Sequence, residues 1–210
     1  MKNICIKTIV LMTLILTLFT SCVNEDDFDI PTLKPVVFSE NFEDITPGSG
    51  ANEIAINLDG WINTNTSGTR VWSGKTFGGN KFAEFSSYYS ASGSSDDAWL
   101  ISSAIDLSSS NNEVLSFNSV NRFFNGNVLT VYISENYDGT IPGIATASWT
   151  ELNPILPNNS SQNDLTIPSE PMDISSYNST NVRIAFRYQG SKTSNPTTTF
   201  QLDEIKIYEN

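Results

Sequence analysis

Apolar residues recur from residue 36 onward in short runs separated by turn residues, and no window keeps a 3.6-residue period. Alternation is cleanest over 129–133 and 182–188, where every second side chain is apolar and is expected to point into a core. This pattern is typical of antiparallel strands with one buried face. We predict strands over 36–43, 60–65, 70–77, 81–88, 99–107, 114–124, 128–134, 148–153, 165–174, 182–188 and 199–208.

Glycine-containing turns lie between several of these runs. Gly79, Gly93, Gly126 and Gly139 supply the positive φ angles that tight connections between strands need. Many short strands with such turns predict an all-β fold, a β-sandwich of two antiparallel sheets. A chain of this length fits one such domain, which we place at 36–210.

The positions expected to face the core change from even to odd numbers within the last predicted strand. Phe200 and Leu202 share one parity, while Ile205 and Ile207 share the other. A β-bulge or bend is therefore expected near Asp203. Such an irregularity either re-aims a side chain at a site or is a plain edge bulge.

The first 21 residues have the features of an export signal. Lys2 and Lys7 precede a mostly apolar stretch over 8–19, which is too short for a comfortable span of about 20 residues. Residues 19–22, Phe-Thr-Ser-Cys, resemble the bacterial lipobox, in which the cysteine receives a lipid, although Phe19 departs from the usual leucine. Cys22 is the predicted lipidation site; the alternative is an ordinary signal cut that leaves a free thiol.

An acidic tether is predicted over 22–35. Four of the residues over 23–29 are acidic, which resembles the surface-export signal of lipoproteins from the Bacteroidota. The alternative is a solvated spacer, and both can hold. We expect a protein lipid-anchored in the outer membrane and facing the cell exterior.

Composition excludes several classes of function. The formal net charge is -12, from 23 acidic and 11 basic residues, so nucleic acid is a poor partner. The chain has no histidine, which removes the commonest general base and the usual zinc ligand. Carboxylate-only catalysis stays open. Cys5 lies in the signal segment, so Cys22 has no partner for an intrachain disulfide.

Five segments taken together resemble the choice-of-anchor J domain, a relative of cleaved-adhesin and MAM-like domains. The resemblance covers nearly all of the chain after the tether and implies a jelly-roll sandwich like those of galactose-binding-like and carbohydrate-binding modules. Its segments are 38–43, 60–61, 97–107, 182–188 and 200–207.

The resemblance also implies a structural calcium that joins the first strand to the last. The matching positions are Glu43 and Asp203, and Glu40 is an alternative ligand because its side chain shares a face with Phe38 and Phe42. Oxygen-only ligands suit a hard cation. The alternative is a set of solvated carboxylates without metal.

No catalytic residue is predicted. Asp96 and Asp97 are adjacent, but neighbours on a strand point to opposite faces and cannot act on one sugar ring. The serines lack a base, and Gly78-Gly79 lacks the lysine and helix of a phosphate loop.

Flat rings and one cation are the candidate ligand contacts: Trp72, Tyr88, Arg122 and Phe124, each of which core packing could also explain. The resulting hypothesis is a non-catalytic, surface-displayed binding module for glycans or with an adhesin-like role. One alternative is a structural or protein-partner subunit of a surface assembly. Another is a carboxylate-based glycan hydrolase, which needs two facing carboxylates about 5 to 9.5 Å apart in a groove.

Overall fold

The computed structural model describes residues 33–49 and 52–210, of which Lys34–Asn210 form one compact unit. The predicted signal peptide, Cys22 and nearly all of the acidic tether lie outside the described residues. Within the described ranges, no helix is long and apolar enough to cross a membrane. The regular structure there is β-strand, with two short 3-10 turns, η3 (Ser87–Tyr89) and η4 (Pro142–Ala145).

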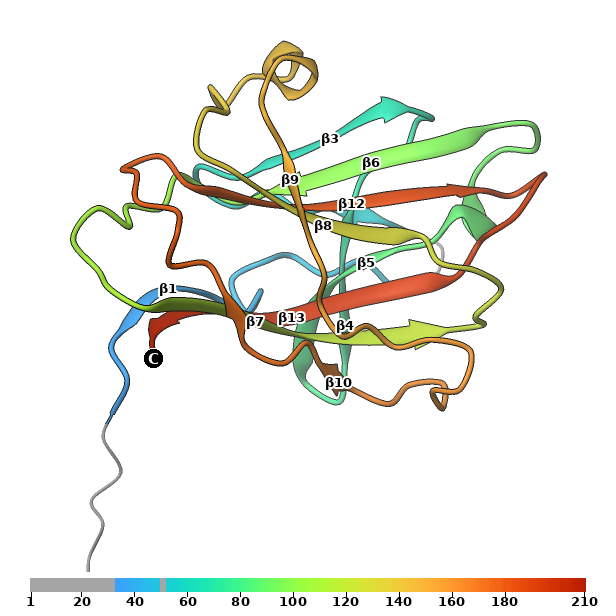
Figure 1. Ribbon diagram of the computed structural model, residues 1–210. Coiled ribbons are helices and arrows are strands. Elements are labelled where there is room, and N and C mark those ends of the chain that lie inside the picture. Colours follow the sequence, from blue (N-terminus) through green and yellow to red (C-terminus); the bar gives the residue numbers. More distant parts are fainter. Residues whose placement is uncertain (1–32, 50–51) are drawn as a thin grey trace, which may run out of the picture. The chain divides into compact units, whose positions relative to one another are not determined.

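Two antiparallel sheets pack face to face (Figure 1), which confirms the predicted all-β jelly-roll sandwich. The larger sheet has the order β10 (Ile167–Pro168), β7 (Glu113–Arg122), β13 (Thr199–Glu209), β5 (Asn80–Phe85), β4 (Ser73–Phe77) and β2 (Ile54–Ala55), with β1 (Val36–Glu40) on β13 and β11 (Met172–Asp173) on β7. The smaller sheet has the order β3 (Ile62–Ser67), β6 (Ser95–Ile101), β12 (Arg183–Ser191), β8 (Leu129–Ser134) and β9 (Thr150–Leu152).

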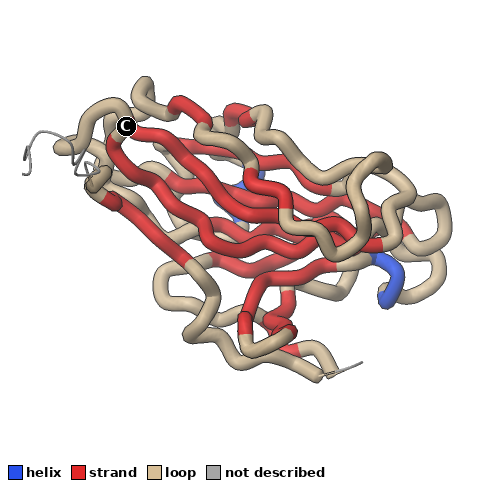
Figure 2. Tube along the Cα trace, turned by 90° about the horizontal axis from the view of Figure 1, so that it is seen from below, coloured by secondary structure: helices blue, strands red, loops and turns tan. Residues whose placement is uncertain are grey.

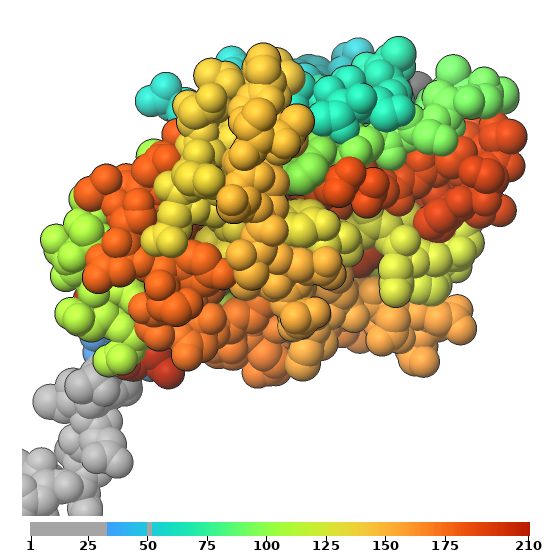
Figure 3. All heavy atoms as spheres, turned by 45° about the horizontal axis from the view of Figure 1, so that its top comes forward, coloured from blue at the N-terminus to red at the C-terminus, as the bar shows by residue number. Residues whose placement is uncertain are grey.

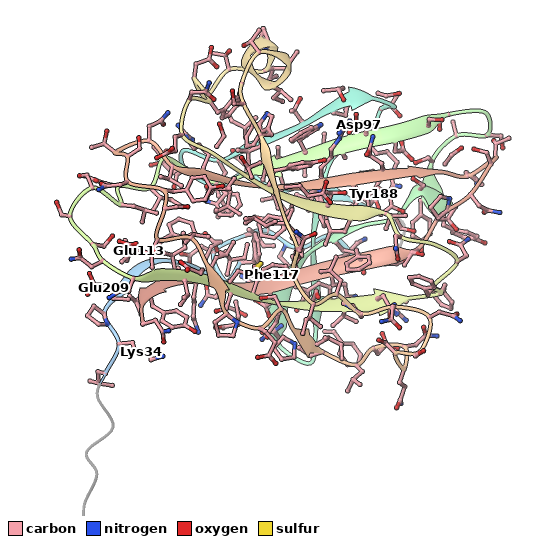
Figure 4. The ribbon with its side chains drawn as sticks, viewed as in Figure 1. Lys34, Asp97, Glu113, Phe117, Tyr188 and Glu209 are labelled. Carbon is pink, nitrogen blue, oxygen red and sulfur yellow. The ribbon has the colours of Figure 1, made fainter. Side chains whose placement is uncertain are left out.

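The core lies between the sheets and follows the predicted alternation. Figure 4 labels Phe117 on the lower sheet and Tyr188 on the upper one, and both side chains are fully buried. The Phe117 ring meets Phe186 edge to face at 5.2 Å, and Phe85 lies 4.4 Å from Tyr188. Each buried ring contributes about 1.5–3 kcal/mol of transfer free energy. Burial raises the pKa of Tyr188 to about 12, and its hydroxyl donates to the Thr198 carbonyl at 2.8 Å.

The predicted bulge in the last strand is confirmed. The pairing of β13 with β7 shifts between Asp203 and Lys206, and Glu204 takes a left-handed φ of 51°. Before the bulge β13 pairs with β5, and after it β13 pairs with β1. The extra residue restores the apolar side chains of both halves to the core side, so Leu202 and Ile205 are both fully buried.

Some predicted strand boundaries are wrong. The strand expected over 99–107 runs from Ser95 to Ile101, and the strand expected over 81–88 ends at Phe85. There the Ser86 side chain accepts a hydrogen bond from the Tyr88 backbone and starts the turn η3. The strand expected over 165–174 is two short pieces, β10 and β11, and β2 was not predicted.

A second hydrophobic layer covers part of the outer face of the smaller sheet. The segment 135–149 folds back over β6 and β12, and Figure 3 shows it in yellow and gold across the upper sheet. Its Tyr137 and Trp149 rings pack on each other at 5.2 Å, and Trp149 lies 5.5 Å from Trp99. Trp99 therefore keeps only 4% of its surface exposed although it points away from the main core.

Candidate functional site

The larger sheet carries a groove of about 930 Å³ on its outer face. The strands that form its floor face the viewer in Figure 2, which looks at the sandwich from below. Residues from four adjacent strands and from three flanking segments outside the strands line it. They include Lys75 and Phe77 of β4, Asn80, Phe82 and Glu84 of β5, Asn118, Val120 and Arg122 of β7, Gln201 and Asp203 of β13, and Gly48, Ser49, Tyr89, Asp164 and Thr166 from the loops.

Strand alternation explains why these residues share one face. On β5, Ala83 and Phe85 are buried in the core, so Glu84 between them points outward into the groove. On β13, Phe200 and Leu202 are buried in the same way. The polar positions of neighbouring strands therefore meet on the outer surface of the sheet.

Two amide side chains hold two groove carboxylates in place. Gln201 Nε2 donates to Glu84 Oε2 at 2.9 Å, across the directly paired strands β13 and β5. Asn80 Nδ2 donates to Asp203 Oδ2 at 2.8 Å. Burial raises the pKa of Asp203 above its ordinary value of 3.8, an effect that the Asn80 hydrogen bond opposes. These four side chains present fixed donors and acceptors before any ligand arrives.

An ion pair lies in another part of the groove. Arg122 Nε is 2.6 Å from Asp164 Oδ1, and both side chains are partly exposed. The Arg122 guanidinium also lies over the Phe123 ring, 5.5 Å from its centroid. The cation of Arg122 is therefore already engaged on two sides.

Exposed rings stand near both ends of β5. Phe77 precedes the strand in the β4–β5 hairpin and is 83% exposed, while Tyr89 follows it and is 60% exposed. Arg70 lies 5.6 Å from the Tyr89 centroid on one side. Phe82 forms part of the floor and is nearly buried. Faces of exposed rings such as Phe77 and Tyr89 are the surfaces on which the apolar faces of sugars stack.

Of the four predicted ligand residues, Arg122 alone borders the groove. Trp72 is a correction to the sequence-based prediction: it is fully buried, 5.9 Å from Phe85 and 6.4 Å from Tyr188, so its ring has no surface for a ligand. Tyr88 is 62% exposed and meets the edge of Tyr89 at 5.3 Å, beside the groove rather than in it.

Phe124, the fourth, is half-buried in the loop after β7 and does not border the groove. Sequence reasoning missed Glu84, Gln201 and Asp164. The available signal was the outward parity of polar residues on the predicted strands over 81–88 and 199–208. The pairing of Glu84 with Gln201, 117 positions apart in the chain, could not be predicted from the sequence.

The predicted calcium ligands do come close to one another. Burial raises the pKa of Glu40, and repulsion from Asp203 adds to this. The pKa of Asp203 is raised by its burial and further by Glu43. β1 ends at Glu40, so Glu43 lies in the turn beyond the strand, as the Glu43 prediction requires.

The oxygens of this cluster are, however, mostly used within the protein. The Lys81 ammonium donates to the main-chain carbonyls of Glu43 at 2.5 Å and Ile45 at 3.1 Å, and the Lys81 backbone donates to Glu43 Oε1. Asp203 accepts from Asn80 and from the Glu204 backbone. Among the residues described, no three acidic, histidine or cysteine side chains form a group that could hold a metal. These contacts use part of the oxygens that a calcium ion would need, and the calcium assignment stays a prediction.

The adjacent acidic pair on β6 points to opposite faces, as expected. Asp96 is buried and accepts hydrogen bonds from the Ser87 and Ser90 hydroxyls, both at 2.6 Å. Asp97 binds Arg187 through two hydrogen bonds of 2.8 and 2.7 Å. Burial works against ionisation of Asp97, but the hydrogen bonds from Arg187 outweigh it and lower its pKa. Neither carboxylate borders the groove.

No protein-family model matches the sequence, and a search of curated proteins finds no significant match. Solved β-sandwich domains do resemble the structure. The K3 cleaved adhesin domain of Lys-gingipain from Porphyromonas gingivalis W83 has a TM-score of 0.51 at 16% identity, over 83% of this chain and 99% of that domain. The K2 domain of Lys-gingipain has a TM-score of 0.49 at 18% identity, over 82% and 99%.

The C-terminal family 22 carbohydrate-binding module of Clostridium thermocellum Xyn10B has a TM-score of 0.41 at 12% identity, over 85% of this chain and 97% of that module. At such identities the likeness to the K3 domain shows the fold alone: this chain has the jelly-roll sandwich fold of that domain.

Proposed function

We propose that this protein is a non-catalytic module that binds a glycan in the groove on its larger sheet. The groove itself carries the proposal. Its volume of about 930 Å³ falls within the range of ligand sites, about 300–1,000 Å³. Exposed rings at Phe77 and Tyr89 provide stacking faces, and the fixed amide and carboxylate groups between them provide the hydrogen bonds that orient hydroxyl groups.

The comparisons support a binding role. The K3 domain, whose fold this chain shares, is by name an adhesin domain, and the Clostridium module is by name carbohydrate-binding. We further propose that the chain is a relative of choice-of-anchor J domains, because the five sequence segments above resemble those of that family. Four of them contribute core residues of the sandwich, among them Phe42, Leu100, Phe186 and Leu202.

Display on the cell surface is part of the proposal. The lipobox-like residues 19–22 support acylation of Cys22 in the outer membrane, and the acidic residues after it support export to the outer face. Labelling cells with a clickable fatty acid tests the anchor, since Cys22→Ala should abolish the label. Protease added to intact cells tests the orientation: an exposed protein is cut, whereas a periplasmic one is cut only after lysis.

A glycan array tests the binding role. The chain from residue 22 onward, carrying Cys22→Ala, is screened, and the strongest hits are titrated by calorimetry. Gln201→Ala removes a groove donor and should weaken binding. Thr130→Ala, on the outer face of the other sheet, is the matched control and should leave it unchanged. An array without hits contradicts the proposal, as does loss of binding in the control alone.

The same hits separate this proposal from hydrolysis. Incubation of each bound oligosaccharide with the protein should leave its length unchanged over days. Shortened products that disappear in Glu84→Gln would assign the groove to a hydrolase instead.

A further inference from the structure

The charges in the groove carry information about its ligand. Five titratable side chains with full charges line it: Glu84, Asp164 and Asp203 on the acidic side, and Lys75 and Arg122 on the basic side. The acidic groups are in excess by one. The chain as a whole has a formal net charge of -12, so the field outside the groove has the same sign.

Neither basic group is available to an anionic ligand without competition. Arg122 is held by Asp164 at 2.6 Å and lies over the Phe123 ring. Lys75 is also engaged within the protein. Asp164 already offsets the charge of Arg122, so a ligand carboxylate that binds the remaining guanidinium N–H groups gains less attraction than it would from an unpaired arginine.

More negative charge lies behind one end of the groove. Burial raises the pKa of Asp203 most, and Glu43 and Glu204 add to this by repulsion, although Glu204 is itself paired with Lys206 and the Lys81 ammonium lies on the Glu43 carbonyl. A ligand anion placed beside Asp203 would meet the same repulsion. Because these groups are partly buried, salt screens this repulsion less than it screens charges on an open surface.

Sugar hydroxyls suit the same surroundings. A hydroxyl donates to a carboxylate oxygen and accepts from an amide N–H, and the groove offers both kinds of group, for example on Glu84, Asn118 and Gln201. An uncharged chain brings many hydroxyls and no charge that must be desolvated or paired.

We infer that the groove takes an uncharged glycan chain and rejects glycans that carry carboxylate or sulfate groups. The inference rests on the proposed function and narrows it to a class of ligand. It follows from the excess of acidic side chains and from the engagement of both cations.

Matched oligosaccharides test the inference. Hexaoses of β-1,4-glucose, β-1,4-mannose and α-1,4-glucose are each titrated beside a counterpart in which the C6 hydroxyls are oxidised to carboxylates. Linkage and length are the same within each pair. At least one neutral hexaose should bind, and its oxidised counterpart should bind at least about tenfold more weakly at low salt. The difference should shrink as salt is added.

A charge variant provides the second arm. Glu84→Gln combined with Asp203→Asn removes two groove charges with little change of shape. The double variant should reduce the difference in affinity between a neutral hexaose and its oxidised counterpart. Glu151→Gln, an exposed position on β9, is the control and should leave this difference unchanged. An oxidised hexaose that binds as tightly as its neutral partner overturns the inference and leaves glycan binding intact. Failure of every hexaose, neutral or oxidised, together with an array without hits contradicts the proposed function itself.

Discussion

The two outer faces of the sandwich are both formed by the alternation of inward and outward side chains along the strands, but one face is covered and the other is open. On the smaller sheet, outward rings such as Trp99 are covered by the segment 135–149, and a second hydrophobic layer forms. On the larger sheet, the outward residues of β5, β7 and β13 are mostly polar and stay open as a groove. The composition of the outward positions thus separates a face that a loop closes from a face that a ligand can reach.

The largest expected effect is on the closed face. Trp99→Ala removes a ring that is 4% exposed and that stacks on Tyr132 at 5.8 Å. We expect the free energy of unfolding to fall by about 3–5 kcal/mol, as for other buried aromatic truncations. Urea titration measures this. Phe77→Ala, on the open face, should change stability by no more than about 0.5 kcal/mol. Similar losses for the two variants would remove the contrast between the faces.

The next effect concerns the link between the open face and the first strand. Lys81→Met keeps the length of the side chain but removes the ammonium that binds the carbonyls of Glu43 and Ile45. A charge-assisted hydrogen bond contributes about 1.5–3 kcal/mol, and a loss of stability of that order is expected. Thermal unfolding of Lys81→Ala and Lys81→Met, compared with Lys81→Arg, separates loss of charge from loss of packing.

The same melting experiment tests calcium. Because Lys81 already supplies a cation to this region, wild-type scans with calcium and with chelator should coincide within a degree or so. A calcium site at hundredfold saturation would add about 2.7 kcal/mol, or roughly 5 to 10 °C for a domain of this size. A shift of that size, lost in Asp203→Asn, would confirm the calcium assignment.

A smaller effect is expected for ligand binding at the open face. Gln201→Ala removes an amide that orients Glu84 and donates to a bound hydroxyl, and should weaken glycan binding by about tenfold, or about 1.4 kcal/mol. Calorimetry with a hit from the array measures this. An unchanged affinity would mean that the ligand binds elsewhere on the molecule.

The smallest effect is a difference in pH dependence between the faces. Burial raises the pKa of Asp203 in the folded protein above its ordinary value of 3.8. The contribution of Asp203 to the free energy of unfolding is therefore complete below the pKa of the unfolded chain, and it is lost as the pH rises through the pKa of the folded protein. The pKa of Asp97 is lowered by Arg187, so its contribution is present above the unfolded value and is lost as the pH falls.

Unfolding profiles from pH 3 to 7 should therefore change in opposite directions in two variants. Asp203→Asn should reduce the fall in stability with rising pH, and Asp97→Asn should reduce the fall with declining pH. Parallel shifts in the two variants would show that the two carboxylates do not differ in this way.

Sequence patterns were sufficient for features that depend on neighbours along the chain. The change of parity between Leu202 and Ile205 located the bulge, because a strand can bury both only if one extra residue is inserted between them. The alternation over 182–188 identified Ile184 and Phe186 as core residues. These inferences need only the two-residue period of a strand.

The groove was decided by the tertiary structure. It exists because β13 lies between β5 and β7, which brings Glu84 beside Gln201 although 117 positions separate them. Trp72 illustrates the same limit, since its flat ring made it a candidate ligand contact, while Phe85 and Tyr188 bury it from other strands. The period of the sequence determines which way each side chain points, whereas long-range pairing determines what each side chain meets there.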